Sequence, residues 1–375
     1  MSNRLLHICL LALTVLCSCQ GNKQGGVSPE GDTLALQYAE LLTVVEYDGY
    51  SVASIRDPWS KGRSLHEYVL VPKDAQLPSH LPKGTLVRTP VAKAVIYTSV
   101  HSALVQELGA EKQIGGVCDL QYIHVPYIIK GVEEGSIKDC GDAMSPDLER
   151  IIDLGPDAIM LSPFENSGGY GRVEELGVPI IECADYMETS ALGRAEWMKF
   201  YGRLFGQAEV ADHLFTEVSE SYQELKAQAA KAATRPSVIT DLKTGSVWYV
   251  PGGQSTQGKL WADANAAYPY ANDTHSGSLA LSFEAVFDKG GDADIWVFRY
   301  NQNTPMTYAQ LAADYRGNAE MKAFKQRRAF GCNTATTAFY EETPFHPDRL
   351  LRDYIQICHP ELDLGGLNYF ERLSE

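Results

Sequence analysis

The sequence predicts an α/β protein in which two Rossmann-like lobes, joined by one long rigid helix, have a ligand cleft between them. Three observations support this fold class. The chain has 375 residues, which is more than a single hydrophobic core usually serves. One long amphipathic segment spans residues 207–233, and short apolar strands alternate with helices on both sides of it. Such alternation is typical of parallel sheets that helices cover on both faces.

The long segment at 207–233 has the period of an α-helix. Its apolar residues recur in steps of three and four and so fall on one stripe: Ala211, Leu214, Phe215, Val218, Tyr222, Leu225, Ala229 and Ala232. Acidic residues occupy its first turns and basic residues its last turns, which suits the helix dipole. A helix of this length spans about 40 Å. We therefore expect a strut between two lobes; the alternative is an ordinary surface helix within one domain.

The chain begins with a segment typical of an export signal. An apolar run follows Arg4 and is too short to serve well as a transmembrane helix. The tetrapeptide LCSC that ends at Cys19 resembles the bacterial lipobox, which implies cleavage before Cys19 and its acylation; Cys17 is the weaker candidate. We expect a signal peptide over residues 1–18. A lipid anchor and flexible tether would follow over 19–33, which are mostly polar and rich in Gly.

Composition limits the classes of partner and of bond. The formal charge of −16 leaves no basic patch for nucleic-acid phosphates. After removal of the leader, five cysteines remain besides Cys19, and they lie far apart in the sequence: Cys118, Cys140, Cys183, Cys332 and Cys358. Because their number is odd, at least one of them is unpaired. Buried thiols are therefore expected for most of them, although a Cys118–Cys140 bridge is conceivable.

The first lobe is expected over residues 34–206, of which 34–89 form a β-rich extension. A hairpin is predicted with Asp48-Gly49 at its turn, followed by a strand over 66–72 and a mostly irregular segment over 72–90. An α/β series then begins. Its predicted strands are 94–98, 114–117, 157–161 and 179–182, a long loop covers 118–131, and its predicted helices are 99–109, 146–154, 172–176 and 192–205.

The second lobe is expected over residues 234–375 and repeats the series. Its predicted strands are 238–240, 247–250, 294–298 and 328–332, and its predicted helices are 258–267, 283–288, 311–324 and 347–358. Parallel sheets place ligand sites at the carboxyl ends of their strands. The loops there, which should line the cleft, are 119–127, 162–170, 243–255, 299–308 and 333–342.

Aromatic residues recur in all five of these loops, and such residues hold large flat or hydrophobic ligands. With one arginine they form the predicted ligand-binding set: Tyr122, Tyr127, Phe164, Tyr170, Trp248, Tyr249, Arg299, Tyr300, Phe339 and Tyr340. For each single ring, the alternative is that it packs a loop onto its lobe.

Two segments, one in each predicted lobe, resemble each other: SPDLERIIDLGPDAIML at 145–161 and LSFEAVFDKGGDADIWVF at 281–298. Both read as a cap, an acid, a helix, a turn, an Asp and a strand. With these motifs the chain resembles the periplasmic binding proteins that deliver ferric siderophores, haem and cobalamin to ABC importers. The resemblance extends from about residue 90 to the end and does not cover the extension at 34–87.

The resemblance implies a function and its partners. The protein would be a lipoprotein anchored to a membrane of the bacterial cell envelope and facing the periplasm, and a monomer. It would capture an iron chelate or a related tetrapyrrole in the cleft and deliver it to an ABC permease and its ATPase. In this family the two motif glutamates, which correspond to Glu149 and Glu284, dock on permease arginines. Arg299, with Lys243 as a second candidate, would neutralise an anionic chelate.

Other classes of function gain less support. None of the motifs GxSxG, GxxxxGK[ST], GxGxxG and HExxH occurs, so we expect no enzymatic activity and no cofactor beyond a transported ligand that contains iron or cobalt. His101 and His124 are the first-lobe histidines that could ligate a metal, but loop or capping roles fit them better. An axial ligand to haem could come from Tyr122, His124 or Tyr127. The alternatives are a cobalamin or corrinoid receptor and a lipoprotein enzyme acting on such a compound.

Overall fold

The computed structural model describes residues 31–165 and 169–375, and the chain from Gly31 on forms one compact unit. The expected signal peptide and the expected lipidation at Cys19 lie outside the described residues. The end of the expected tether does not, because Asp32–Thr33 is strand β1 and pairs with β2. Among the described helices, none has the length and hydrophobicity needed to cross a membrane.

Five parallel strands form the main sheet of the first lobe, in the order β12-β11-β6-β7-β8. They are β6 Ala94–Ile96, β7 Ile114–Val117, β8 Lys138–Asp139, β11 Ala158–Leu161 and β12 Ile180–Glu182. The helices are α1 Ser99–Glu107, α2 Pro126–Glu133, α3 Leu148–Leu154, α4 Ala191–Glu196 and α5 Met198–Phe205, and a small ribbon pairs β9 Gly141–Asp142 with β10 Ser145–Pro146. Alternate strand residues enter two apolar clusters, with Ile96 in one and Val95 in the other, so both faces of the sheet are buried.

The extension is a second sheet that shares the core of the first lobe. Its order is β1-β2-β3-β4-β5, with β2 Leu42–Tyr47, β3 Tyr50–Arg56, β4 Ser64–Pro72 and β5 Thr85–Thr89. The predicted hairpin is confirmed: Tyr47 pairs with Tyr50 across a turn in which Gly49 has a φ of +83°, a conformation that glycine adopts without strain. The prediction that 72–90 is mostly irregular missed β5, which pairs in parallel with β4.

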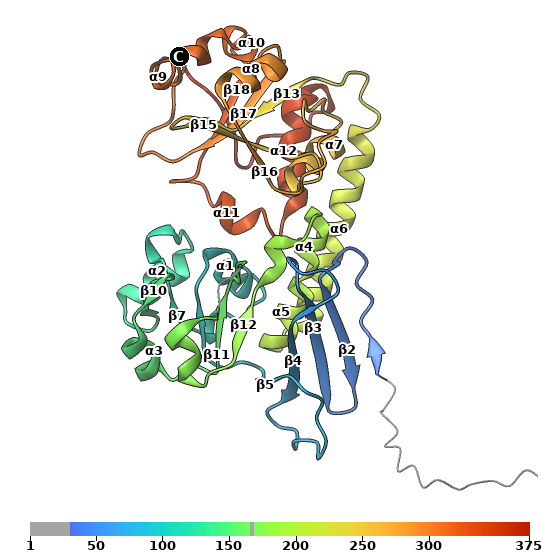
Figure 1. The fold of residues 1–375 in the computed structure, drawn as a ribbon, viewed down its shortest axis with the longest axis vertical. Helices are drawn as coiled ribbons and strands as arrows, with labels where there is room; N and C mark the ends of the chain where they lie inside the picture. Colours follow the sequence, from blue (N-terminus) through green and yellow to red (C-terminus); the bar gives the residue numbers. More distant parts are fainter. Residues whose placement is uncertain (1–30, 166–168) are drawn as a thin grey trace, which may run out of the picture. The chain divides into compact units, whose positions relative to one another are not determined.

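Helix α6, Ala208–Ala229, connects the two lobes (Figure 1). Its 22 residues give it a length of about 33 Å, shorter than predicted. Ala211 and Phe215 join the core of the first lobe, whereas Val218 and Tyr222 join that of the second. The stripe predicted from the sequence therefore belongs to one helix that is built into both hydrophobic cores.

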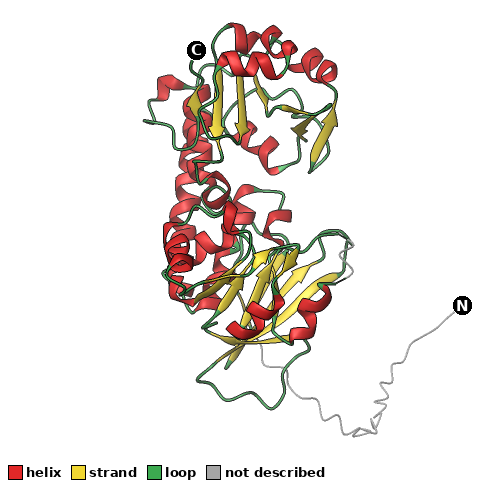
Figure 2. Ribbon diagram, turned by 90° about the vertical axis from the view of Figure 1, so that its left-hand side faces the viewer, coloured by secondary structure: helices red, strands yellow, loops and turns green. Residues whose placement is uncertain are grey.

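The second lobe contains a sheet in the order β13-β17-β18-β19, in which the first three strands are parallel, and the antiparallel sheet β14-β15-β16. Its strands are β13 Val238–Thr240, β14 Lys243–Thr244, β15 Val247–Pro251, β16 Ser278–Leu281, β17 Ile295–Tyr300, β18 Ala329–Asn333 and β19 Glu371–Arg372. Its helices are α7 Thr256–Asp263, α8 Phe283–Gly290, α9 Tyr308–Asp314, α10 Lys322–Lys325, α11 Phe339–Glu342 and α12 Pro347–Cys358 (Figure 2).

Several predicted elements differ from the structure, among them a strand, a helix and a loop. The strand predicted at 247–250 exists, but as β15 it lies in the antiparallel sheet. The helix predicted over 311–324 is interrupted after α9, where Tyr315 is extended and Gly317 packs so tightly that a Cβ would lie 2.6 Å from the Phe283 ring. The loop predicted over 118–131 contains most of α2, which the proline at its first position helps to start.

Candidate ligand-binding cleft

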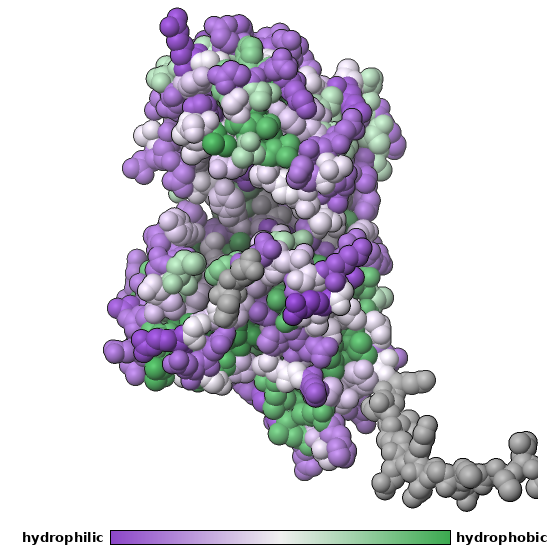
Figure 3. All heavy atoms as spheres, viewed as in Figure 1, coloured by the Kyte–Doolittle hydropathy of each residue, from purple (hydrophilic) through white to green (hydrophobic). Residues whose placement is uncertain are grey.

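A cavity of about 510 Å³ lies between the two lobes, where the surface is hollowed (Figure 3). The first lobe contributes Tyr186 and Arg194 to its lining, and the second lobe contributes the remainder. Two cavities of similar volume, about 570 and 540 Å³, are lined by the extension together with other parts of the first lobe and the start of α6. The cavity between the lobes is the better candidate because it lies at the carboxyl ends of parallel strands.

A charged arginine lies on the second-lobe side of this cleft. Arg299 is the fifth residue of β17, and its Nη2 lies 2.6 Å from Oδ1 of Asp241, which directly follows the neighbouring strand β13. The guanidinium also lies 5.6 Å from the ring centre of Phe339 and 6.0 Å from that of Tyr340. Burial lowers the pKa of Arg299, but the Asp241 carboxylate more than offsets this effect and the net shift is upward. The cleft therefore contains a cation that stays charged and has a fixed position.

Exposed tyrosine rings and hydroxyl groups make up much of the remaining lining. Tyr249 and Tyr340 are each 52% exposed and Tyr186 is 37% exposed, although all three are large and partly apolar. The serine and threonine side chains of the lining are Thr244, Ser255, Thr256, Ser276, Ser278 and Thr343. Rings that remain open to solvent in a concave site, beside hydroxyl groups and a cation, suit a bulky ligand with both apolar and anionic parts.

The first-lobe side of the cleft has a second arginine, which a buried acid holds in place. The Nε of Arg194 donates to Oδ2 of Asp185 at 3.0 Å, and the other oxygen of Asp185 lies 2.8 Å from Nε2 of His101 and accepts from the Tyr201 hydroxyl. Burial alone would raise the pKa of Asp185, but His101 and Arg194 bring it down to about 2. Burial alone would lower the pKa of His101, but Cys183 and Asp185 raise it. The resulting pKa of His101 is about 10. His101 is thus part of a buried ion cluster.

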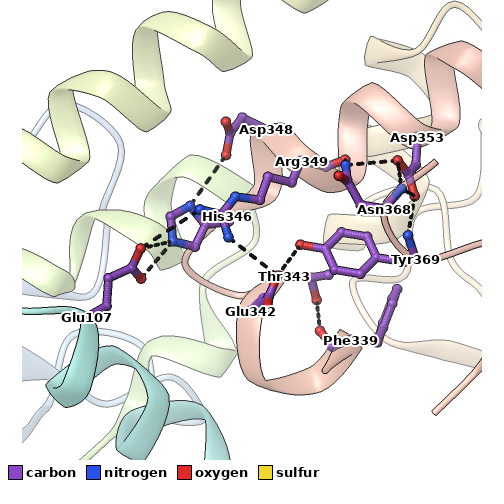
Figure 4. Close-up of polar contacts among 10 residues, drawn as sticks. All are labelled: Glu107, Phe339, Glu342, Thr343, His346, Asp348, Arg349, Asp353, Asn368 and Tyr369. Carbon is purple, nitrogen blue, oxygen red and sulfur yellow. Dashed lines mark hydrogen bonds and ion pairs between the residues drawn. The ribbon is translucent and has the colours of Figure 1, made fainter. Parts of the chain in front are cut away.

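Helix α11 has the cleft on one side and the first lobe on the other. Phe339 and Tyr340 line the cleft, whereas Glu341 accepts the backbone N–H of His124 at 2.6 Å. Close by, Nε2 of His346 lies 2.7 Å from Oε2 of Glu107 on α1 (Figure 4). The two lobes therefore contact each other directly beside the cleft, as well as through α6.

The structure brings four of the ten predicted ligand-binding residues to this cavity: Tyr249, Arg299, Phe339 and Tyr340. Tyr170 lines a different cavity, where its hydroxyl donates to Glu182. Tyr300 is half-buried, and its hydroxyl accepts from the backbone N–H of Met306. The other three tyrosine and phenylalanine side chains are exposed on the first lobe without lining the cavity: Tyr122, Tyr127 and Phe164.

Trp248 is a correction to the predicted set. It is fully buried, its ring stacks 5.5 Å from that of Trp296, and its Nε1 donates to the carbonyl of Thr240 at 2.9 Å. The prediction counted the strand 247–250 within the cleft loop 243–255, whereas the residues of β15 alternate between the core and the cleft. Trp248 therefore takes the core side and Tyr249 the open side.

The lining residues that sequence reasoning missed include Tyr186, Arg194 and Asp241. Asp241 directly follows the predicted strand 238–240, so extending the cleft loop back to that strand end would have included it. Arg194 lies within a predicted helix and gave no separate signal. Lys243, the second candidate cation, does not line the cavity, since its Nζ bonds to the carbonyl of Gly245 and lies 4.4 Å from the Tyr315 ring.

The histidines give no metal site in the described parts of the chain. Within residues 31–165 and 169–375, no three His, Cys, Asp or Glu side chains are grouped so as to hold a metal ion. His101 belongs to the ion cluster described above, and Nε2 of His124 lies 3.2 Å from the carbonyl of Ala335. Tyr122, His124 and Tyr127, which were considered as axial ligands to haem, do not line the cleft.

Glu149 and Glu284 occupy equivalent positions in their two helices. Each is the second residue, of α3 and of α8 respectively, behind a capping side chain, Asp147 or Ser282, that accepts a backbone N–H. Both glutamates are exposed and neither lines the cleft. Hydrogen bonds from its own backbone N–H and from the Ser282 hydroxyl lower the pKa of Glu284, so this carboxylate is charged at neutral pH.

Comparison with known proteins places these features in context. The family described as "Periplasmic binding protein" matches residues 94–335. A lipoprotein of Methanocaldococcus jannaschii is 23% identical over 399 residues, covering 97% of this chain and 94% of the relative.

Three solved structures illustrate the likeness in fold. The structure of the ABC-type Fe3+-hydroxamate transport system from Saccharomonospora viridis has a TM-score of 0.54 at 17% identity. The match covers 71% of this chain and 92% of that chain. The molybdate periplasmic binding protein MolA of Haemophilus influenzae has a TM-score of 0.58 at 16% identity, with coverages of 74% and 89%. The periplasmic vitamin B12 binding protein BtuF of Vibrio cholerae has a TM-score of 0.52 at 14% identity, with coverages of 72% and 96%. At these identities the likeness concerns the fold alone.

Proposed function

Because the chain belongs to the family of periplasmic binding proteins, we propose that it is the solute-binding lipoprotein of an ABC importer. Its solute is an iron chelate, such as a siderophore complex or haem, or a related tetrapyrrole. The observation that carries this proposal is the cleft, where the charged Arg299 lies beside the exposed rings of Tyr249 and Tyr340. The role is capture and delivery rather than catalysis.

The chemistry of the lining supports a ligand of this class. The cavity has a volume of about 510 Å³, which is in the range of small-molecule sites. A ferric chelate or a haem has flat or apolar parts that tyrosine rings can cover, together with anionic oxygens that a guanidinium can pair with. Cobalamin, the ligand named for one structural neighbour, is the alternative solute, and its lower charge would make less use of Arg299.

Exchanging the cleft arginine tests this assignment. Arg299→Gln should weaken binding of a ferric siderophore or haem about tenfold or more, because a hydrogen bond to a charged group contributes roughly 1.5–3 kcal/mol. Lys243→Gln is the matched control, since Lys243 lies outside the cleft lining. Isothermal calorimetry with both compounds and with cobalamin measures the effect. Equal affinities for Arg299→Gln and Lys243→Gln would refute the role of Arg299.

Delivery requires a second surface. We assign permease docking to Glu149 and Glu284, which are exposed, lie outside the cleft and occupy equivalent helix positions in the two lobes. Carboxylates at such positions can pair with permease arginines, and the spacing set by the two lobes would fix the register.

The anchor belongs to the same proposal. Cys19 is the expected lipidation site, and the similar chain from Methanocaldococcus jannaschii is also described as a lipoprotein. The protein would then be held at a membrane of the cell envelope and face the periplasm. Cys19→Ala should shift the protein from the membrane fraction to the soluble fraction, or block its processing, when cells are fractionated. A processed Cys19→Ala protein that stays with the membrane would contradict the lipid anchor.

A further inference from the structure

Two cysteines end neighbouring strands of the first-lobe sheet in the same register. Cys118 directly follows β7 and Cys140 directly follows β8, and the last paired residues of these parallel strands are Val117 and Asp139. The backbone N–H of Cys140 donates to the carbonyl of Val117 at 2.8 Å, which is the last hydrogen bond of the Val117–Asp139 pair. The next N–H along β7, that of Asp119, donates to the carbonyl of Gly141 at 2.8 Å. A regular parallel ladder would use the carbonyl of Cys140 instead, so the pairing ends at Val117 and Asp139, and Cys118 and Cys140 are the residues that follow this last pair on the two strands.

Both side chains face the same buried side of the sheet. Cys118, Cys140 and Tyr97 all belong to the same apolar cluster, which also contains Val95 of β6. Cys140 Sγ lies over the neighbouring strand, since a Cβ placed on Gly116 of β7 would be 2.8 Å from it. Adjacent strands lie about 4.8 Å apart, which is within the Cα separations that disulfides bridge.

The folded lobe shields these thiols from chemistry. Burial, followed by the proximity of Cys140, raises the pKa of Cys118, and burial raises the pKa of Cys140 to about 11. Thiolates are the reactive species, so the pair is unreactive once the lobe has formed. Both thiols are free in the structure, so a bond between their sulfurs would have to form while the chain is still folding.

We propose that Cys118 and Cys140 become joined by a disulfide as the exported chain folds in an oxidising compartment. The oxidant is a disulfide of another molecule, such as oxidised glutathione or a thiol–disulfide oxidoreductase. The two cysteines lose two protons and two electrons as their S–S bond forms, and the S–S bond of the oxidant breaks into two thiols. The inference rests on the export that belongs to the proposed function, and not on the identity of the ligand.

The bond has a structural role in this lobe. Strand β8 has only two residues and lies at the edge of the sheet, so few backbone hydrogen bonds hold it. The disulfide would fasten β8 to β7 at the end from which the 119–127 loop departs and would close a loop that contains α2. Cys183 cannot take part, because it belongs to the cluster on the other face of the sheet.

Oxidative refolding tests the proposal directly. The reduced, unfolded full chain is refolded with reduced and oxidised glutathione, alkylated and digested with trypsin. Cleavage after Lys130 and Lys138 separates the two cysteines, so the disulfide appears as a link between the peptides of residues 113–130 and 139–150. We expect this link as the main product, and thermal unfolding should occur roughly 5 °C or more lower once it is reduced.

Two serine variants serve as the comparison. Cys140→Ser should lose both the link and the effect of reduction on thermal unfolding, whereas Cys183→Ser, which removes a buried thiol of the same lobe, should keep both. Recovery of both peptides in alkylated form after refolding of the wild-type chain would overturn the proposal. So would their recovery in alkylated form from protein isolated from its own cell envelope, and that result would count against export as well. Neither result bears on which ligand the cleft holds.

Discussion

Trp248 and Tyr249 show how one strand serves both the core and the candidate site. They are consecutive residues of β15, so their side chains point to opposite sides of the sheet. Trp248 is fully buried between aromatic neighbours, whereas Tyr249 is 52% exposed and lines the cleft. Removing each ring should therefore affect a different property of the protein.

We predict that Trp248→Ala lowers the free energy of unfolding by about 3–5 kcal/mol, because it leaves a cavity and an unpaired Thr240 carbonyl. Tyr249→Ala should change stability little but weaken ligand binding by about 1–3 kcal/mol through lost ring contact. Thermal unfolding and calorimetry with a ferric siderophore or haem separate the two effects. A destabilised Tyr249→Ala with normal affinity would show that the two sides have been assigned wrongly.

At the scale of single residues, the sequence predicts which types of side chain lie near the cleft better than it predicts which way each side chain points. The residue types in the cleft loops gave Tyr249, Arg299 and Tyr340, which do line the cavity. The same reasoning also selected Trp248, because aromatic residues pack in hydrophobic cores as readily as they line ligand sites. Alternation along the predicted strand 247–250 places the two neighbours on opposite faces, but the sheet that the strand joins decides which face lies on the core.

Among the elements, one tyrosine of the extension bonds to the backbone at the edge of the first-lobe sheet. The hydroxyl of Tyr68, on β4, donates to the carbonyl of Ile180 at 3.0 Å and accepts the backbone N–H of Glu182 at 2.8 Å. Those are the two groups that a further strand beside β12 would have bonded, and β12 is at the edge of its sheet. Tyr68 therefore covers an exposed strand edge while it anchors the extension.

Tyr68→Phe should reduce stability by about 1–3 kcal/mol, because the ring remains but two backbone groups lose their partner. Tyr47→Phe is the matched control in the same sheet: that ring stacks 4.9 Å from Tyr50, and we expect a change within about 0.5 kcal/mol. Chemical denaturation monitored by circular dichroism compares the two variants. If both unfold like the wild type, the hydroxyl of Tyr68 does not hold the extension in place.

Elements with local signals were the ones that the sequence predicted well. The Asp48-Gly49 hairpin, strand 114–117 and helix 347–358 agree with β2–β3, β7 and α12 because turn chemistry, β-branched residues and helical period act within a few residues. Strand β5 and the small antiparallel sheet were missed or misplaced, since pairing with distant strands decides them. Helix α6 ends at Ala229, four residues before the predicted end.

Over the whole molecule, the two lobes present equivalent carboxylates on their surfaces. Glu149 and Glu284 are the second residues of α3 and α8, and these helices precede the parallel strands β11 and β17 in the same way. The resemblance of the two segments was visible in the sequence. The contact between His346 and Glu107, which are 239 residues apart, was not visible there, because it depends on how the finished lobes meet.

Charge reversal at both glutamates should uncouple delivery from capture. In Glu149→Arg/Glu284→Arg, like charges would face each other at the permease, so uptake should fall severely while ligand affinity in solution stays unchanged. The single Gln variants should be milder and more sensitive to salt. Glu209→Arg, at the exposed start of α6, is the control and should take up ligand normally. Uptake by the double variant at the wild-type rate would remove docking from these two residues.

The central claim is that the cleft carries an iron chelate or a related tetrapyrrole. Native mass spectrometry of the protein released from its own cell envelope tests it most directly, because the bound solute is weighed without being chosen in advance. The account predicts one small molecule per chain whose isotope pattern contains iron, or cobalt for the corrinoid alternative, and which Arg299→Gln retains less well. A metal-free solute in the cleft, together with no affinity for ferric siderophores, haem or cobalamin, would contradict it.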